Sequence, residues 1–423
     1  MKTVQANLDA HLQSIYFDDF PKTIQDAITI TRQLGIKYLW VDALCIIQDL
    51  REDFIREVAL MTDIYANSTL TISAEDATDC SKGIFKDRNL SSTTILPLGL
   101  RLPSNNGENR QTPKCASVSA IPKLVSQNEH ERRTHLATRG WTLQEYALSS
   151  RMLCYSSADL KWRCSKEVWS QSLQLIRDPT WRNLKTNLSR KPGSGRDTMG
   201  VHWVFQTWIS LISDYTGREL TDPRDSLFAV AGLQSRIATI IEDVPSIGMW
   251  RGPNFWKSLL WFSRPRVLAS NRFHIRCPSW SWASACSPVK YLEYRSQKSI
   301  ILPELRSWDL ETVEDNVHIR GSITLKCPLL PGSILRDIDK THILENYKDP
   351  NFPENDGNLW LLHLLNEYLR PGDRKAGTPF RATLMFIEKI SPDKMHFRRV
   401  GLAQVIYSEL LVRRRGMETI QLF

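Results

Sequence analysis

Apolar residues near the start of the chain recur at two spacings, which predict two kinds of element. A helix is predicted between Pro21 and Gly35, because Pro is tolerated in a first helical turn and glycine ends a helix through its positive φ. The residues that follow, Tyr38–Val41, are aromatic and β-branched and predict a short buried strand. One face of the helix carries residues spaced by three and four: Ile24, Ala27, Ile28, Thr31 and Leu34.

The alternation of helix and strand continues to about residue 73. Asp49 and Glu52 have the spacing of a capping box and predict a helix start. A strand is predicted over Thr69–Ser73. Strands joined by helices form parallel sheets, so the N-terminal domain is predicted to be α/β, a parallel sheet with flanking helices. The apolar stripe of the second helix consists of Phe54, Val58, Met61 and Tyr65.

Two acidic residues stand where ligands bind in such folds. Asp42 comes directly after a predicted strand, with Cys45 and Gln48 in the following loop, and ligands of open α/β sheets lie beyond the strand ends. Glu57 lies about 60° from the centre of its helix's apolar stripe, at the rim of the helix. Simpler interpretations stay open: Asp42 caps a turn, and Cys45 is a small buried hydrophobe.

After the first α/β stretch, the sequence predicts a loop and a hairpin that complete the N-terminal domain, followed by two further regions. Residues 93–135 are rich in Pro, Ser and Asn and predict a variable loop before the domain closes. A hairpin is predicted from Met152–Tyr155 and Leu160–Arg163. These features place an α/β domain at residues 1–165, a mainly helical region at 166–298 and a β-rich region at 299–423.

Within the helical region, Trp203–Gly232 is predicted to be helical. Trp280 and Trp282 are two residues apart, so on a strand they would share one side. They would then form either a packed aromatic pair or an aromatic cage for a ligand.

Composition narrows the function classes. The 423 residues are 42% hydrophobic and 24% charged, as in ordinary globular proteins, and no internal repeat occurs. The net charge is +9, with 55 basic and 46 acidic residues. The basic residues are dispersed, which favours a solvated surface over a specific nucleic-acid site.

Eight widely spaced cysteines form no Cys-x-x-Cys pair, so we expect neither a zinc site nor a disulfide scaffold. We also expect no signal peptide and no membrane span, and therefore a soluble cytoplasmic protein.

Several long motifs occur in an order that resembles one family. They are Pro21-Lys22-Thr23-Ile24-Gln25-Asp26-Ala27, Tyr38-Leu39-Trp40-Val41-Asp42-Ala43-Leu44-Cys45-Ile46-Ile47-Gln48-Asp49, Asp53-Phe54-Ile55-Arg56-Glu57, Met61-Thr62-Asp63-Ile64-Tyr65-Ala66-Asn67 and Arg139-Gly140-Trp141-Thr142-Leu143-Gln144-Glu145. Together they resemble the fungal HET (heterokaryon incompatibility) domain. Downstream, Tyr215–Gly232 is similar to an element that commonly follows HET domains. The family usually opens with a Leu-Ser-Tyr-x-Trp-Gly strand, which residues 1–19 do not match, so we expect this domain to lack its first strand motif.

The resemblance implies a signalling module of fungal nonself recognition that triggers programmed cell death through protein partners. It also implies an alternative, because HET domains have been thought distantly similar to TIR domains, some of which cleave NAD. In that case the fold is TIR-like, Glu57 stabilises the cationic ribosyl transition state and Asp42 orients the ribose. No cofactor or metal is expected, and NAD would be a substrate. The candidate ligand-binding residues are Trp40, Cys45, Gln48, Trp141 and Glu145.

Overall fold

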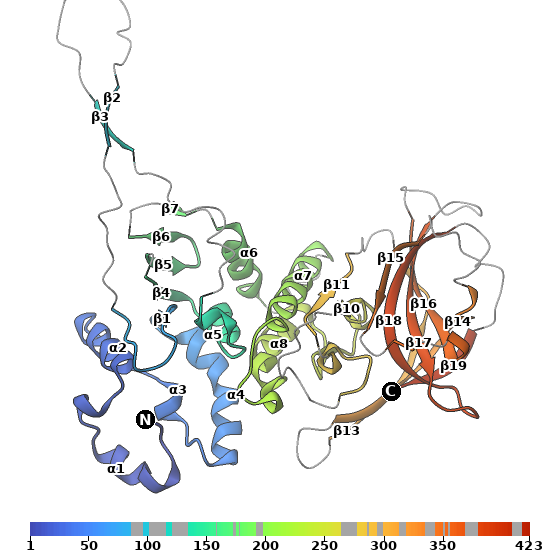
Figure 1. The fold of residues 1–423 in the computed structure, drawn as a ribbon, viewed down its shortest axis with the longest axis horizontal. Coiled ribbons are helices and arrows are strands. Elements are labelled where there is room, and N and C mark those ends of the chain that lie inside the picture. The colour runs from blue at the N-terminus through green and yellow to red at the C-terminus, as the bar shows by residue number, and fades with distance from the viewer. Residues whose placement is uncertain are drawn as a thin grey trace, which may run out of the picture.

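The computed structural model describes the chain from an N-terminal α/β part to a C-terminal β-rich part (Figure 1). Residues not described are 86–95, 101–115, 121–133, 158, 172–174, 177, 192–197, 264–276, 286, 294–298, 313–318, 335–342, 350–351, 354–355, 369–379 and 408–416. Most of the predicted loop 93–135 therefore lies outside the described residues. The part that is described contains an antiparallel ribbon of two strands, β2 (Leu96–Leu100) and β3 (Ala116–Ala120).

The N-terminal part is mixed α/β. Its sheet has the strand order β1-β4-β5-β6-β7, and β1 and β4 are parallel whereas the remaining pairs are antiparallel. The prediction of a parallel sheet is thus right for one strand pair. The predicted hairpin is confirmed as β4 and β5. The elements are α1 (Leu8–Gln13), α2 (Lys22–Gln33), α3 (Asp42–Cys45), α4 (Arg51–Asn67), β1 (Thr71–Ala74), α5 (Thr142–Leu148), β4 (Arg151–Tyr155), β5 (Leu160–Cys164), β6 (Val168–Ser170) and β7 (Leu175–Ile176).

The predicted strand Tyr38–Val41 is wrong. Val41 has an extended backbone, with φ −134° and ψ 120°, but no described strand runs beside it. Its carbonyl instead accepts from the backbone N–H groups of Leu44 and Cys45 and starts α3. An extended segment without a ladder partner satisfies its backbone groups with water, and Tyr38 accordingly is 88% exposed.

The two long helices predicted near the start of the chain, α2 and α4, are both present in the structure. Gly35 follows α2 with φ +69°, as predicted. The helix predicted after Asp49 is α4, but the capping box is wrong, because Leu50 precedes its first turn. The Asp49 carboxylate instead accepts from the backbone N–H of Gln5 at 2.9 Å, and so fastens the N-terminal segment.

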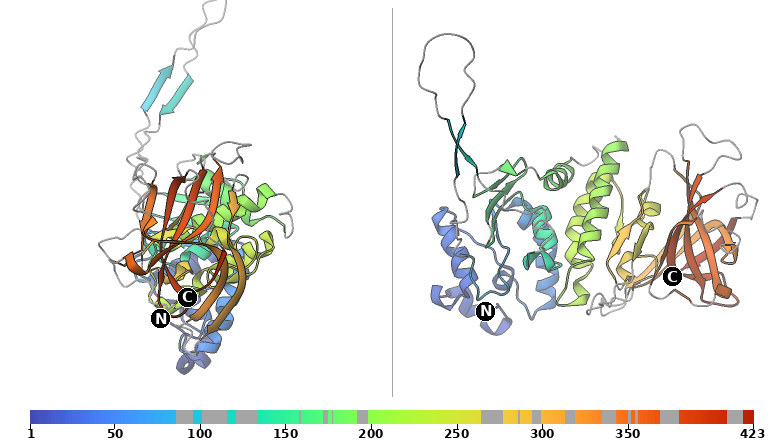
Figure 2. Two further views of the ribbon diagram at one scale, coloured as in Figure 1. Left: turned by 90° about the vertical axis from the view of Figure 1, so that its right-hand side faces the viewer. Right: turned by 45° about the horizontal axis from the view of Figure 1, so that its top comes forward.

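The middle of the chain is helical with short strands. The helix predicted over Trp203–Gly232 is two helices, α7 and α8, which lie side by side in Figures 1 and 2. Pro223 interrupts the helical pattern between them. The described elements are α6 (Pro179–Leu188), α7 (Thr198–Tyr215), α8 (Phe228–Ile241), β8 (Pro245–Ser246), β9 (Met249–Trp250), α9 (Phe255–Ser258), β10 (Trp261–Ser263) and β11 (Val289–Tyr291). No described helix combines the length and the apolar character that crossing a membrane requires.

Trp280 and Trp282 are not on a strand. They lie in a turn and a 3-10 helix (Trp282–Ser284), and both are fully buried. The Trp282 indole N–H donates to the Gly248 carbonyl at 2.7 Å, and Trp280 meets Trp308 edge to face at 4.7 Å between ring centroids. Core packing is therefore the correct alternative for this pair.

The C-terminal part is β-rich, as predicted. The eight strands among its described residues follow the order β12-β16-β17-β18-β19-β14-β13, with β15 beside β18 and an added pairing of β14 with β16. One continuous core cluster runs from α5 through α7 and α8 to this sheet. The strands are β12 (Ser299–Ile301), β13 (Glu304–Thr312), β14 (Ile319–Pro331), β15 (Ile343–Lys348), β16 (Leu359–Tyr368), β17 (Phe380–Lys389), β18 (His396–Tyr407) and β19 (Met417–Leu422).

Candidate functional site

The segment that carries Asp42 is a helical turn followed by a braced loop. Asp42 is the first residue of α3, is exposed, and accepts from the Ala43 backbone N–H at 2.7 Å. The Gln48 side-chain amide donates to the carbonyls of Asp42 and Ile46 at 3.2 and 3.1 Å. Gln48 therefore folds back along the loop and holds its shape.

A residue of α4 that the sequence analysis did not select fixes this loop. The buried Asp53 carboxylate accepts from the Ile47 backbone N–H at 2.7 Å and is ion-paired with Arg56. A carboxylate buried beside backbone donors is costly to replace, because the freed N–H would lose its partner. The sequence feature that could have indicated Asp53 is its position in the first turn of an amphipathic helix, where the helix dipole stabilises acidic side chains.

The Cys45 thiol is close enough to Asp42 and Glu57, the two predicted catalytic acids, for their charges to affect its pKa. The pKa of its thiol is raised, first by desolvation and then by the nearby charges of Glu57 and Asp42. Glu57 is mostly buried, with 18% of its side chain exposed, and is 3.4 Å from Arg56 Nε. A raised pKa keeps the thiol protonated and disfavours Cys45 as a nucleophile.

A second acid, Glu145, faces Asp42 from α5. Its pKa is raised to about 7 by burial and then by the charge of Asp42, against the lowering effects of Arg139, the Tyr65 hydroxyl and Arg218. Burial, Glu145 and Asp42 together also raise the pKa of Tyr65 well above its usual value. We call Asp42, Tyr65 and Glu145 the acidic cluster. Trp40 packs edge to face on Tyr65, with 5.7 Å between ring centroids.

Trp141 lies elsewhere, at the boundary with the downstream helices. Its ring meets Phe54 edge to face at 6.2 Å, and its indole N–H donates to Asp225 at 3.3 Å. The structure thus brings Trp40, Asp42 and Glu145 together around Tyr65, and it places Cys45 near the charges of both Asp42 and Glu57. It places Trp141 in a packing role.

The strand-end argument that selected Asp42 does not hold, because residues 1–41, all of which the structure describes, form no strand. Asp42 and Glu57 nevertheless act on one thiol, since the loop after α3 is held against α4 by Asp53. Glu145 is among the expected ligand-binding residues, but no motif or spacing predicts its proximity to Asp42.

The closing motif of the domain is joined to the downstream element. The buried Arg218 donates from Nη1 to the Thr142 hydroxyl at 3.0 Å and pairs with Asp214 at 2.6 Å. The Gly140 N–H donates to the Glu219 carbonyl at 2.7 Å. A Cβ on Gly140 would come 2.5 Å from Leu220 Cδ2, so any larger residue there would require the Leu220 side chain to move.

A second close approach involves Gly232 of α8. Its N–H donates to Gln144 Oε1 at 3.2 Å, and a Cβ there would overlap the Thr62 hydroxyl. The helix α8 therefore packs directly on α4 and α5, the two helices that carry Tyr65 and Glu145.

The acidic cluster can exchange a proton near neutral pH. Two carboxyl groups in different environments, one of them with a pKa near 7, are an arrangement that suits acid–base chemistry. Among the described residues, no group of three His, Cys, Asp or Glu side chains could hold a metal ion.

These features define a mixed α/β domain with a carboxylate cluster, packed against downstream helices. Residues 2–145 of this domain match the family model described as "Heterokaryon incompatibility protein (HET)". The resemblance inferred from the motifs is thereby confirmed over that range. Comparison with curated proteins and comparison with solved structures each gave no match.

Proposed function

We propose that this chain is a cytoplasmic signalling module of fungal nonself recognition, whose HET domain triggers programmed cell death. The match of residues 2–145 to the HET family is the observation that carries the proposal. We take residues 1–165 as the executing domain, and 166–298 and 299–423 as the regions that regulate it or bind protein partners.

Direct packing between the parts supports such regulation. Arg218 and Gly232 belong to the downstream region, and they contact Thr142 and Gln144 of α5. Because α5 also carries Glu145, a partner that shifts α8 would change the surroundings of the acidic cluster. We propose no specific nucleic-acid partner.

Expression of the full chain in a fungal host, with viability as the readout, tests this function. We expect growth arrest on induction, and we expect Asp53→Asn to reduce it, because that change releases the loop after α3. The exposed Asp63→Asn on the same helix is the matched control. Full growth with abundant, folded protein would count against the proposal.

A second candidate function is hydrolysis of NAD by a TIR-like domain. It is favoured by the pKa of Glu145 near 7 beside Asp42, and by the charges of Glu57 and Asp42 that both act on the Cys45 thiol. In this scheme Glu57 and Asp42 are catalytic, and Trp40, Cys45, Gln48 and Glu145 bind the ligand, whereas Trp141 packs between the domain and the downstream helices. Stabilisation of a cationic ribosyl group by carboxylates is the chemistry of glycoside hydrolysis.

Measurement of NAD together with viability separates the two functions. Loss of NAD that Glu57→Gln abolishes would establish the hydrolase. Cell death that persists in Glu57→Gln with NAD unchanged would remove it and leave the signalling role. Glu52→Gln, an exposed position on the same helix, serves as the control.

A further inference from the structure

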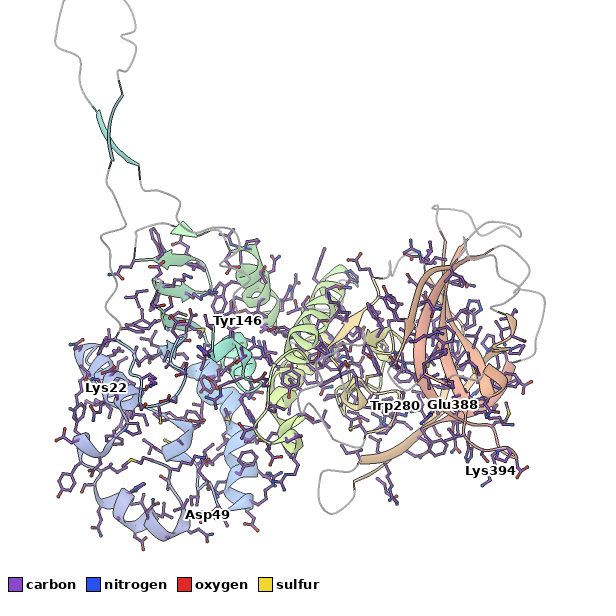
Figure 3. The ribbon with its side chains drawn as sticks, in the orientation of Figure 1. Lys22, Asp49, Tyr146, Trp280, Glu388 and Lys394 are labelled. Atoms are coloured by element: carbon purple, nitrogen blue, oxygen red, sulfur yellow. The ribbon has the colours of Figure 1, made fainter. Side chains whose placement is uncertain are left out.

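A cavity of about 160 Å³ lies between the middle region and the C-terminal sheet. It is far along the chain from the acidic cluster. Figure 3 shows Trp280 on the side of the middle region that faces this sheet. A cavity of about 150 Å³ accommodates a benzene-sized molecule, so this one suits a ligand of about six heavy atoms. Its lining includes Trp261, Ser263, Asp349 and Arg399.

Arg399 brings a buried cation to the cavity. The residue is 4% exposed, and its guanidinium lies 3.3 Å from the centroid of the Trp261 ring. Nη2 donates to the Trp261 carbonyl. Nε and Nη1 are also buried, and they have no hydrogen-bond partner among the described residues.

Unpaired guanidinium donors are an unusual cost in a folded protein. Buried polar groups are normally hydrogen-bonded, and a buried charge without a partner is strongly unfavourable. Burial lowers the pKa of Arg399 to about 10, against the opposing charges of Asp349 and Tyr291. An anionic ligand would accept a hydrogen bond that the guanidinium lacks and would add to the countercharge that Asp349 provides. A carboxylate can take two parallel bonds from one edge of the guanidinium, here from one of the two unpaired nitrogens together with the second N–H of Nη2.

Asp349 brings a carboxyl group, a hydrogen-bond acceptor, to the same cavity. It follows β15, and its N–H donates to the Val400 carbonyl at 3.0 Å. The Ser263 hydroxyl is 3.4 Å from its carboxylate, a long hydrogen bond. The pKa of Asp349 is raised by burial, against Arg399 and Ser263. A dianion beside this carboxyl group would be repelled, which favours a monoanion that carries a hydrogen-bond donor.

We propose that this cavity binds a small organic carboxylate bearing a hydroxyl or ammonium group, with its carboxylate on Arg399 and its donor on Asp349. The apolar part of the ligand lies against the Trp261 ring. Binding would tie β10 to β15 and β18, and so fasten the C-terminal sheet to the middle region.

Isothermal titration of the full chain with glycolate tests the proposal. We expect saturable binding, about tenfold weaker binding of acetate, which lacks the hydroxyl donor, and none of the neutral glycolamide. Asp349→Asn should bring glycolate down to the affinity of acetate. No saturable binding of glycolate or glycine would overturn the proposal, as would inorganic phosphate binding more tightly than either.

Two variants place the ligand within the cavity. Arg399→Met should abolish binding, whereas Arg398→Met should change it less than threefold, because the Arg398 guanidinium is already paired with Glu388 at 2.7 Å. If Arg399→Met does not fold, Ala285→Leu fills the cavity wall without removing a charge and should also abolish binding. Unchanged glycolate affinity in folded Ala285→Leu would contradict the assignment.

Discussion

Arg218 reaches from the segment after α7 to the hydroxyl of Thr142, the first residue of α5, at 3.0 Å. The same side chain donates to the Arg139 carbonyl at 3.3 Å and pairs with Asp214. Thr142 in turn donates to the carbonyls of Leu136 and Arg139. Two motifs almost eighty residues apart thus form one hydrogen-bonded unit.

Replacing Arg218 by Met should lower the free energy of unfolding by about 2–3 kcal/mol, because the Thr142 hydroxyl and the Asp214 carboxylate both lose a charged partner. Chemical denaturation measures this change. The matched control is Arg224→Met, since Arg224 is 60% exposed and its pair with Asp222 is on the surface. Equal effects of the two substitutions would contradict the buried role of Arg218.

Replacing Gly232 by Ala should destabilise the protein, although Ala normally favours a helix by about 1 kcal/mol over Gly. The new Cβ would overlap the Thr62 hydroxyl and come 2.8 Å from Gln144 Oε1. Thermal unfolding of the single variant and of Gly232→Ala with Thr62→Ala checks this cause. The double variant should recover part of the lost stability, and a stabilised single variant would show that α8 is not packed this closely.

Glu145 should give the protein a pH dependence near neutrality. Its pKa in the fold is about 7, above its usual value of 4.5. A raised pKa contributes stability below the unfolded value, and this contribution is lost as pH rises through the folded value. The free energy of unfolding should therefore fall by about 3 kcal/mol between pH 4.5 and 7. Glu145→Gln should remove most of this fall, whereas the exposed Glu52→Gln should keep it.

Asp26 should act in the opposite direction at low pH. Burial alone would raise its pKa, but hydrogen bonds from Lys22, Ile84 and Phe85 outweigh burial and lower it. A lowered pKa contributes stability above the unfolded value of 3.8, which is lost as pH falls through the folded value. Asp26→Asn should therefore be destabilised at pH 7, by about 2 kcal/mol.

Urea denaturation at several pH values tests the prediction for Asp26. The difference between wild type and Asp26→Asn should shrink below about pH 4, whereas Asp18→Asn, at an exposed position, should match wild type throughout. A difference that stays constant with pH would mean that the charge of Asp26 does not matter.

Elements with local signals could be predicted from the sequence. Pro21 and Gly35 bound α2 because first-turn tolerance and positive φ are properties of single residues. The hairpin of β4 and β5 was likewise found from its own alternation. The strand prediction for Tyr38–Val41 is wrong because a strand needs a neighbouring strand, and strand pairing depends on the whole sheet.

The candidate site could be predicted only in part, because contacts between distant residues leave no local signal. Asp42 is predicted from a strand end that the structure does not contain, and Glu57 from its position at the rim of its helix. The two residues act on one thiol because Asp53 holds the loop, which no short pattern reveals. The pairing of Asp42 with Glu145 joins residues about a hundred positions apart. Arg399 was not selected at all, since a buried arginine in a β-rich segment has no spacing that distinguishes it from surface arginines.

The continuous core that links α5 to α7 and α8 has a practical consequence for work with fragments. Leu143 and Ala147 are almost fully buried, and they belong to the same core cluster as Trp208 and Leu233. A polypeptide ending after the β4–β5 hairpin would expose this apolar side of α5 to solvent. Such a fragment would tend to aggregate or to bind chaperones. Recombinant versions of the N-terminal domain should therefore extend at least through Ile241, the last residue of α8.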